Sequence, residues 1–532
     1  MIEIYDTTLR DGTQGEGVSL TLGDKLRVTE WLDDFGVAAI EGGWPGSNAK
    51  DAGYFRAARR LELKRARVVA FGSTRRPGSD SNDDANLRAL LDAETEVVTI
   101  FGKSSIRHVT RALKTTLDEN LRMVEQSVAH LRRSGRRVIF DAEHFFDGYE
   151  EDADYALRVL KAAREGGAER LVLCDTNGGH LPWRVEEIVR RAAGEIETPL
   201  GIHAHNDSGC AVANSLAAVR AGATHVQGTI NGIGERCGNA DLCATIADLE
   251  LKLDRRCLPE GGLGRLTDLA RRVAEIVNAA PPGAAPYVGR SAFAHKGGVH
   301  VAAIRRDPGA YEHVDPAVVG NETRVLVSEL SGRGNLRSFA DRIGVEIENA
   351  SAGEMLGRIK ELERDGFAFE AAPATVELML RREGKDYRPF FELIDFHVVV
   401  EHRAGRGHLA EANVKVSVGG DVMHTAAEGP GPVAALDAAL RKALAERYPV
   451  IDRFEIADYK VRTLDADRGA ASGVRVLVDT SDGDARWSTV GASRNIIEAS
   501  WRALFDGYEY GLLQASEGRW PAERASAAAQ AG

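Results

Sequence analysis

Short apolar runs alternate with amphipathic segments over the first 255 residues of the chain. The runs are four or five residues long and rich in Val, Ile and Leu, which is typical of strands buried on both faces. The segments between them repeat apolar positions with a helical period, and several end at a Gly, at positions 36, 166 and 222, as helix C-caps do. The predicted strands are residues 2–5, 38–42, 68–71, 97–101, 138–141, 171–174, 200–203 and 225–228.

Eight strand–helix alternations within this length predict a (β/α)8 TIM barrel. An open doubly wound sheet is the alternative fold. That fold favours a Gly-rich nucleotide loop after the first strand, and residues 6–12 do not form one. We therefore place the barrel ahead of the open sheet.

The pattern changes after the predicted barrel. Residues 286–385 are mixed, with helical stretches at 336–343 and 352–365. Further on, strands are expected at residues 396–401, 412–418, 459–463 and 473–480, and helices at 432–448 and 493–505. The chain is accordingly divided into a barrel (1–275), a mostly helical linker region (276–388), a C-terminal α+β domain (389–515) and an Ala/Ser-rich disordered tail (516–532).

Polar side chains follow the predicted strands at the points where the strands end. Residues 6–12 read Asp-Thr-Thr-Leu-Arg-Asp-Gly, residues 141–144 read Asp-Ala-Glu-His, and residues 203–207 read His-Ala-His-Asn-Asp. The carboxyl ends of all barrel strands lie on one face, and TIM barrels carry their active sites there. A random surface would not place Asp, His, Asn and Arg so consistently at strand ends. The pattern predicts an active site.

The strongest single element is His203-x-His205. Residues two apart in a strand point to the same side, so both imidazoles can face one ion. Asp11 and Asn239 are the expected oxygen ligands, because the first and eighth strands close the barrel beside the seventh. Such a set suits a divalent ion of the Mn, Co or Zn type, with Mg also allowed. The alternative is that two polar residues lie at the end of this strand by chance and bind no ion.

Three further residues are weighed as chemical groups. The Arg10 guanidinium suits an anionic oxygen, although a structural salt bridge to Glu41 is an equally simple interpretation. Glu143 is either an acid–base group or a hydrogen-bond anchor. Cys237 lies in the last loop and is interpreted as a small filler residue.

Composition narrows the class of protein. The chain has 532 residues, 43% of them hydrophobic and 28% charged, which predicts a globular protein of several domains. The net charge of −12 argues against a general nucleic-acid binder. We expect no membrane span and no secretory signal, and the scattered, odd number of five Cys favours a reduced, cytoplasmic protein.

Together these residues resemble the DRE-TIM metallolyase superfamily, and within it the Claisen-condensing isopropylmalate, homocitrate and citramalate synthases. Residues 6–12 resemble the family's first signature, and residues 203–207 with 232–239 resemble its second. Residues 291–300 are similar to the family's linker segment. Residues 41–47, which read Glu-Gly-Gly-Trp-Pro-Gly-Ser, and residues 175–179 resemble one bacterial citramalate synthase branch.

The resemblance implies a metal-dependent condensation of acetyl-CoA with a 2-oxo acid, here pyruvate, within isoleucine biosynthesis. It also implies that His300 is the catalytic base, folded over the site from the same or a neighbouring subunit, with Glu143 as the competing assignment or its partner. Arg10, Asp11 and Glu41 match the residues that give the superfamily its name. The substrate-contact and remaining catalytic candidates are Arg10, Asp141, Thr176 and, weakly, Tyr311.

The C-terminal domain resembles a regulatory dimer domain that binds a branched-chain amino acid. Gly429, Gly431 and a second Gly/Ser turn around Ala492 are weak candidates for the effector site in a homodimer or larger oligomer. Isoleucine would suit citramalate synthesis and leucine would suit isopropylmalate synthesis. A rigid helix start is the plainer interpretation of the glycines.

Three alternatives stay open at this point. An isopropylmalate or homocitrate synthase would use a larger 2-oxo acid. A lyase of the same superfamily would be little more than the barrel, and residues 286–515 weigh against it. A non-catalytic amino-acid sensor would not need the intact set Arg10, Asp11, His203, His205 and Asn239.

Overall fold

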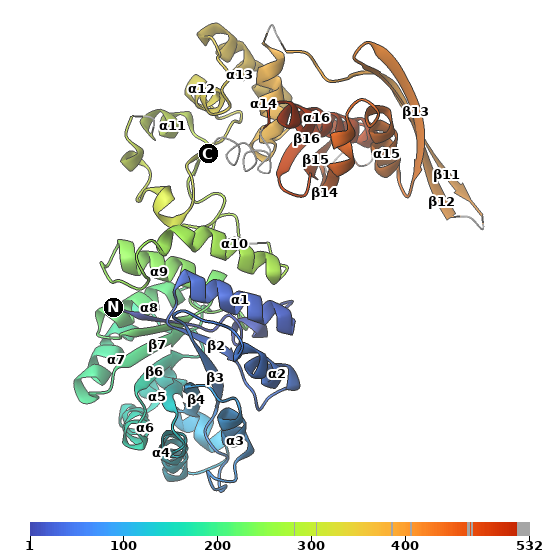
Figure 1. Ribbon diagram of the computed structural model, residues 1–532. Helices are drawn as coiled ribbons and strands as arrows, with labels where there is room; N and C mark the ends of the chain where they lie inside the picture. Colours follow the sequence, from blue (N-terminus) through green and yellow to red (C-terminus); the bar gives the residue numbers. More distant parts are fainter. Residues whose placement is uncertain are drawn as a thin grey trace, which may run out of the picture. The chain divides into compact units, whose positions relative to one another are not determined.

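The computed structural model describes residues 1–280, 282–304, 306–384, 387–404, 407–464, 469 and 472–518. The chain divides into two compact units. The first comprises residues 1–293 and 312–323, and the second comprises residues 294–311 and 324–532. Each unit has its own architecture (Figure 1).

The first unit is a closed barrel of eight parallel strands in sequential order, from β1 to β8, with β8 paired back to β1. This confirms the predicted TIM barrel. The strands are β1 (Glu3–Asp6), β2 (Ala39–Gly43), β3 (Arg67–Ser73), β4 (Val97–Lys103), β5 (Arg137–Glu143), β6 (Arg170–Asp175), β7 (Leu200–Ala204) and β8 (His225–Gly228).

Helices surround the strands on the outside (Figure 1). They are α1 (Leu22–Phe35), α2 (Ala49–Ala58), α3 (Ala85–Asp92), α4 (Leu117–Arg133), α5 (Phe145–Glu151), α6 (Ala153–Gly166), α7 (Pro182–Glu195), α8 (Ala211–Arg220), α9 (Leu242–Leu251) and α10 (Leu266–Ile276).

Two apolar layers explain why the sequences of the strands are nearly continuous runs of hydrophobic residues. A large core of buried residues, among them Val28, Leu90 and Val138, fills the space between strands and helices. A small separate cluster that includes Tyr5, Val69 and Val172 packs on the other faces of the strands. Since both faces of a barrel strand are buried, polar side chains are confined to the strand ends.

Local signals fix the helix ends. Thr21 and Asp24 form a reciprocal capping box at the start of α1, and Gly36 ends that helix with φ of +107°, a value that favours glycine. The sequence placed the cap of α6 at Gly166, which is wrong by one residue. Gly166 is the last helical residue, and Gly167 is the left-handed cap with φ of +96°.

The second unit is made of short helices followed by two three-stranded antiparallel sheets. Its first part contains β9 (Ala294–His295), α11 (Gly298–Ile304), β10 (Arg324–Val325), α12 (Arg333–Arg342), α13 (Asn349–Arg364) and α14 (Pro373–Arg382). Its second part contains β11 (Glu392–Arg403), β12 (Gly407–Val418), β13 (Asp421–Gly429), α15 (Pro432–Leu444), β14 (Glu455–Thr463), β15 (Val474–Ser481), β16 (Arg486–Ser493) and α16 (Ile496–Ser516). The helical linker and α+β class predicted from the sequence are confirmed.

Two strands of the α+β part were not predicted. β13 places only two large apolar side chains, Val422 and Met423, in nine residues, so its pattern is weak. The Gly/Ser turn expected at residues 491–493 is instead the end of β16, and Ala492 is a buried strand residue paired with Arg475. The predicted tail lies outside the described residues from position 519 on.

Within the described part of the chain, no helix is both long and apolar enough to cross a membrane.

The amino end of the barrel carries an ion-pair group that makes stability depend on pH. Glu3 of β1 contacts Arg170 of β6, and its carboxylate lies 3.4 Å from Nδ1 of His225 in β8. Burial would raise the pKa of Glu3, but the interactions with His225 and Arg170 outweigh it and lower this pKa to about 2. The stabilisation is therefore complete above the unfolded pKa of 4.5 and is lost as the pH falls toward 2.

We expect Glu3→Gln to lower the free energy of unfolding by about 1 kcal/mol at pH 7, since the pair is only partly buried. The difference from the wild-type midpoint in calorimetric thermal unfolding should shrink as the pH falls below 4.5. Glu62→Gln, at an exposed position, serves as the control. A difference for Glu3→Gln that stays constant from pH 7 to pH 3 would contradict the assignment.

Candidate active site

A pocket of about 200 Å3 opens at the carboxyl ends of the barrel strands. Its lining brings together residues that the sequence placed at the ends of different strands. They are Arg10, Asp11, Asp141, Glu143, Thr176, His203 and His205, joined by Trp44, Phe71, Phe101, Cys174 and Arg236 among others.

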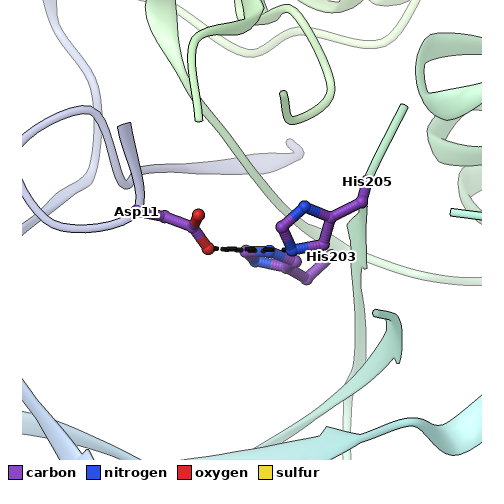
Figure 2. Close-up of side chains that lie close together, drawn as sticks. All are labelled: Asp11, His203 and His205. Atoms are coloured by element: carbon purple, nitrogen blue, oxygen red, sulfur yellow. Dashed lines mark ion pairs between the residues drawn. The ribbon is translucent and has the colours of Figure 1, made fainter. Parts of the chain in front are cut away.

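Three buried side chains at the base of this pocket form a group that could hold a metal ion. Oδ2 of Asp11 lies 3.4 Å from Nε2 of His203 and 3.8 Å from Nε2 of His205. Figure 2 shows the carboxylate pointing at both imidazole rings. His203 is in β7 and His205 directly follows that strand, so the two rings reach the ion site from the same side.

The loop after β1 owes its shape to the Asp-Thr-Thr sequence. The Asp6 carboxylate accepts hydrogen bonds from the backbone N–H and the hydroxyl of Thr8, at 2.9 Å each. The Thr8 hydroxyl accepts a hydrogen bond from the backbone N–H of Ile230, which joins this loop to the one after β8. Burial raises the pKa of Asp6 to about 7. These bonds turn the chain so that Asp11 enters the pocket.

Asn239 lies directly beside this group. It pairs with His205 in an isolated antiparallel bridge, and its Nδ2 donates to Oδ1 of Asp11 at 3.2 Å. Its Oδ1 is buried and accepts no hydrogen bond from any described residue. Gly234 permits this close packing, because a Cβ there would lie 2.2 Å from Asn239 Nδ2. A buried oxygen without a donor fits a cation ligand.

The chemistry of these four side chains fits a divalent ion. Two imidazole nitrogens, one carboxylate and one amide oxygen suit Mn, Co or Zn. Burial, followed by the neighbouring His203, lowers the pKa of His205 to about 4. His205 is therefore neutral near pH 7 and offers a lone pair.

Gln227 orients one of these imidazoles, and the sequence did not reveal it. Its Oε1 lies 2.8 Å from Nδ1 of His203, and its Nε2 donates to Oδ1 of Asp141 at 3.1 Å. Burial, followed by the charge of Glu41, raises the pKa of Asp141 to about 7. The available signal was the alternation His225-x-Gln227 in β8, which places two polar side chains inside the barrel.

Arg10 lies between two carboxylates. It forms the expected salt bridge with Glu41 and also lines the pocket. Its Nε donates to Oε1 of Glu41 at 2.5 Å, and its Nη1 donates to Oδ2 of Asp11 at 3.1 Å. Tyr5 also donates to Glu41, at 2.6 Å, and Arg10 stacks 3.8 Å above the Phe71 ring centroid. The guanidinium is held in one orientation at the edge of the pocket.

Glu143 and Thr176 line the same pocket as Asp11, His203 and His205. Glu143 forms an ion pair with Lys103 at the end of β4, a partner that the sequence did not indicate. The Thr176 hydroxyl accepts a hydrogen bond from the backbone N–H of His144 at 2.8 Å. The Thr176 hydroxyl proton is thus available to a ligand.

Trp44 forms one wall of the pocket with two phenylalanines. Its ring packs edge-on against Phe71 and Phe101, at centroid distances of 5.8 and 5.6 Å. Its indole N–H donates to Oδ1 of Asn86 at 2.7 Å, and the Asn86 amide donates to the Ser73 carbonyl. The aromatic wall, Trp44–Phe71–Phe101, is fixed rather than adaptable.

The remaining predicted site residues belong to the second unit. His300 and Tyr311 are both exposed, and their rings stack with centroids 4.2 Å apart. Gly429 ends β13, Gly431 caps the amino end of α15, and the Ala492 carbonyl accepts a hydrogen bond from Arg502. The roles of these five residues stay predictions.

We expect Gln227→Leu to weaken metal binding, because His203 would lose the acceptor that fixes its ring orientation. Losses of about 10-fold to 100-fold in metal affinity are typical for such outer partners. Titration of the metal-free protein with Mn or Zn gives the affinity. Thr99→Val removes a buried hydroxyl from the same barrel interior, one that bonds to Tyr5, and is the matched control. Equal affinities in the two variants would contradict the role of Gln227.

Family models match three successive parts of the chain. Residues 1–273 match the HMGL-like model, residues 287–366 the homocitrate synthase post-HMGL domain-like model, and residues 370–512 the LeuA allosteric (dimerisation) domain. The last of these matches confirms the prediction that the C-terminal domain is a regulatory domain.

Curated relatives cover nearly the whole chain. The (R)-citramalate synthase of Geobacter sulfurreducens is 50% identical over 97% of this chain and 98% of its own. That of Synechocystis sp. is 52% identical over 96% of each chain. A probable 2-isopropylmalate synthase of Methanopyrus kandleri is 32% identical over 95% of this chain and 97% of its own. The chain belongs to the (R)-citramalate synthase family of condensing acyltransferases.

Proposed function

We propose that this chain condenses acetyl-CoA with pyruvate and hydrolyses the thioester, giving (R)-citramalate and CoA within isoleucine biosynthesis. One observation carries the proposal. The buried Asp11–His203–His205 group lies in a small pocket that the aromatic wall lines, and beside the group the buried Oδ1 of Asn239 has no hydrogen-bond donor among the described residues. Full-length similarity to (R)-citramalate synthases supports the choice of reaction.

The barrel residues would hold and polarise the 2-oxo acid. Asp11, His203, His205 and Asn239 would bind a divalent ion, which when bound supplies a Lewis acid for the keto oxygen. Arg10 would donate hydrogen bonds to the same oxygen as its negative charge develops, an effect of about 3 kcal/mol per well-placed donor. Thr176 would donate its hydroxyl proton to the carboxylate, since the hydroxyl already accepts from His144.

A base must remove a proton from the acetyl methyl group before the new carbon–carbon bond can form. We assign this step to His300, because histidine is the side chain that most often serves as a general base, and Tyr311 is stacked on its ring. Glu143, which lines the pocket, is the competing base or the partner of His300. Water then attacks the thioester carbonyl, the carbon–sulfur bond breaks, and CoA leaves as a thiol.

Regulation and assembly form a separate part of the proposal. The match to a dimerisation domain supports a homodimer, in which His300 reaches the barrel of the same or the neighbouring subunit. An amino acid, isoleucine rather than leucine for this product, would bind near Gly429, Gly431 and Ala492.

The substrate choice is tested by CoA release from acetyl-CoA with Mn present. Pyruvate, 2-oxobutyrate, 2-oxoisovalerate and 2-oxoglutarate are compared at equal concentrations. We expect a clear preference for pyruvate, because the rigid aromatic wall limits the room beside the metal-ligating group. Preference for 2-oxoisovalerate or 2-oxoglutarate would move the assignment to isopropylmalate or homocitrate synthesis, and no release with any of them would refute a condensing synthase.

Trp44→Ala tests the structural cause of this preference. Removing the indole should raise kcat/KM for 2-oxobutyrate relative to pyruvate by about tenfold, the scale of one extra methylene in a pocket. Trp183→Ala, at a Trp that is 69% exposed, is the matched control.

We expect His300→Ala to lower kcat by about 100-fold or more while metal content stays unchanged, since His300 is assigned proton transfer and not metal binding. Metal is measured by elemental analysis of the purified variant. His402→Ala, at another exposed histidine of the second unit, should keep full turnover. Undiminished turnover of His300→Ala would transfer the base to Glu143.

A further inference from the structure

The segment that leaves the pocket after β4 is unusually basic. Between positions 102 and 117 the chain carries Lys103, Arg107, Arg111 and Lys114 and no acidic residue, although its net charge is −12. Lys103 is paired with Glu143. The other three are exposed, and none forms an ion pair with a residue that the structure describes. Three unpaired cations on a short stretch make a local positive field in an acidic protein.

This basic segment, residues 103–114, starts at the rim of the pocket. Phe101, two residues before it, lines the pocket wall. The Lys103 ammonium pairs with the Glu143 carboxylate, and the backbone N–H of Ser104 donates to the Glu143 carbonyl at 3.0 Å. The start of the basic segment is therefore attached to Glu143, a residue that lines the pocket.

The segment is also held in an uncommon conformation. Residues His108–Ala112 form a turn of π-helix, anchored by Val109, which is fully buried. The His108 ring stacks on His144, with centroids 3.8 Å apart and planes at 12°, and His144 has a φ of +57°. Such conformations are costly for ordinary residues and collect at functional sites.

Two hydrogen bonds to Glu151 hold the residues at the start of the π-helical turn. The Glu151 carboxylate accepts hydrogen bonds from the Ser105 hydroxyl at 2.8 Å and from the backbone N–H of Arg107 at 3.2 Å. The backbone is thus fixed at the start of the turn, while the side chains of Arg107, Arg111 and Lys114 form no ion pair within the described part of the chain. The arrangement favours a preformed binding surface over a solvated loop.

We propose that Arg107, Arg111 and Lys114 bind the phosphate groups of the acyl-CoA thioester. The inference rests on the proposed function, in which the acetyl end enters the pocket. A cavity of about 200 Å3 has room for the reacting groups but not for a nucleotide with its phosphates, which must lie outside the rim. Guanidinium groups match phosphate oxygens in pairs, and an ammonium adds a point charge.

The test compares the triple variant R107Q/R111Q/K114Q with the wild type on two thioesters. One is acetyl-CoA and the other is acetyl-pantetheine, which lacks the phosphates and the nucleotide. We expect KM for acetyl-CoA to rise about tenfold, the combined effect of three exposed ionic contacts. KM for acetyl-pantetheine, KM for pyruvate and kcat should not change. The acetyl-CoA KM of the wild type should also rise with salt, and that of the variant should not.

R60Q/R88Q/R133Q is the matched control, because it removes three exposed arginines, one just after α2, one in α3 and one at the end of α4, and changes the net charge equally. An acetyl-CoA KM equal to that of this control would overturn the proposal, as would an equal loss on both thioesters.

Calorimetric titration with CoA separates this inference from the proposed function. If the wild type turns over none of the 2-oxo acids, the proposed reaction fails, yet CoA binding still tests the basic segment. A CoA dissociation constant about tenfold weaker in R107Q/R111Q/K114Q than in the control variant supports the phosphate site. Unchanged CoA affinity overturns it.

Discussion

The largely buried Arg10 guanidinium, shared between Glu41 and Asp11, is the interaction on which the carboxyl-terminal face of the barrel depends. Charges removed from water are costly unless each has a partner, and here two carboxylates share one cation. Tyr5 satisfies the second oxygen of Glu41, so the excess negative charge is left at Asp11, where two imidazoles face it. A positive charge beside Asp11 would balance this network, and the two imidazoles that face the carboxylate are placed to provide or to bind one.

The barrel could be predicted from the sequence because its strands are buried on both faces and its helices carry clear stop signals. The α+β part was harder. β13 and β16 were missed because each carries only two large apolar side chains, Val422 and Met423 in β13 and Trp487 and Val490 in β16. Ala492 was assigned to a turn because Gly and Ser surround it, yet the glycine at 491 is needed where a Cβ would lie 2.0 Å from the Ala499 carbonyl. Close approach of a helix, and not a turn, explains this glycine.

For the candidate site, sequence reasoning reached the groups whose chemistry is distinctive and whose spacing matches a strand. His203-x-His205 is the clearest case, and the structure brings both rings to Asp11. It did not reach the partners of those groups. Gln227 and Lys103 are ordinary side chains until the closure of the barrel sets one beside His203 and the other beside Glu143. Pairings that depend on which strands are neighbours leave no local pattern in a single sequence.

The anchoring of Trp44 restricts how the pocket can change over evolutionary time. Its indole N–H satisfies the Asn86 carbonyl oxygen, while the Asn86 amide bonds to the Ser73 backbone. Replacing Trp44 alone by a smaller residue would leave that oxygen without its donor, so selectivity and local stability are coupled. Enlarging the pocket at Trp44 would therefore cost local stability, and a second substitution at Asn86, 42 positions further along the chain, could relieve that cost.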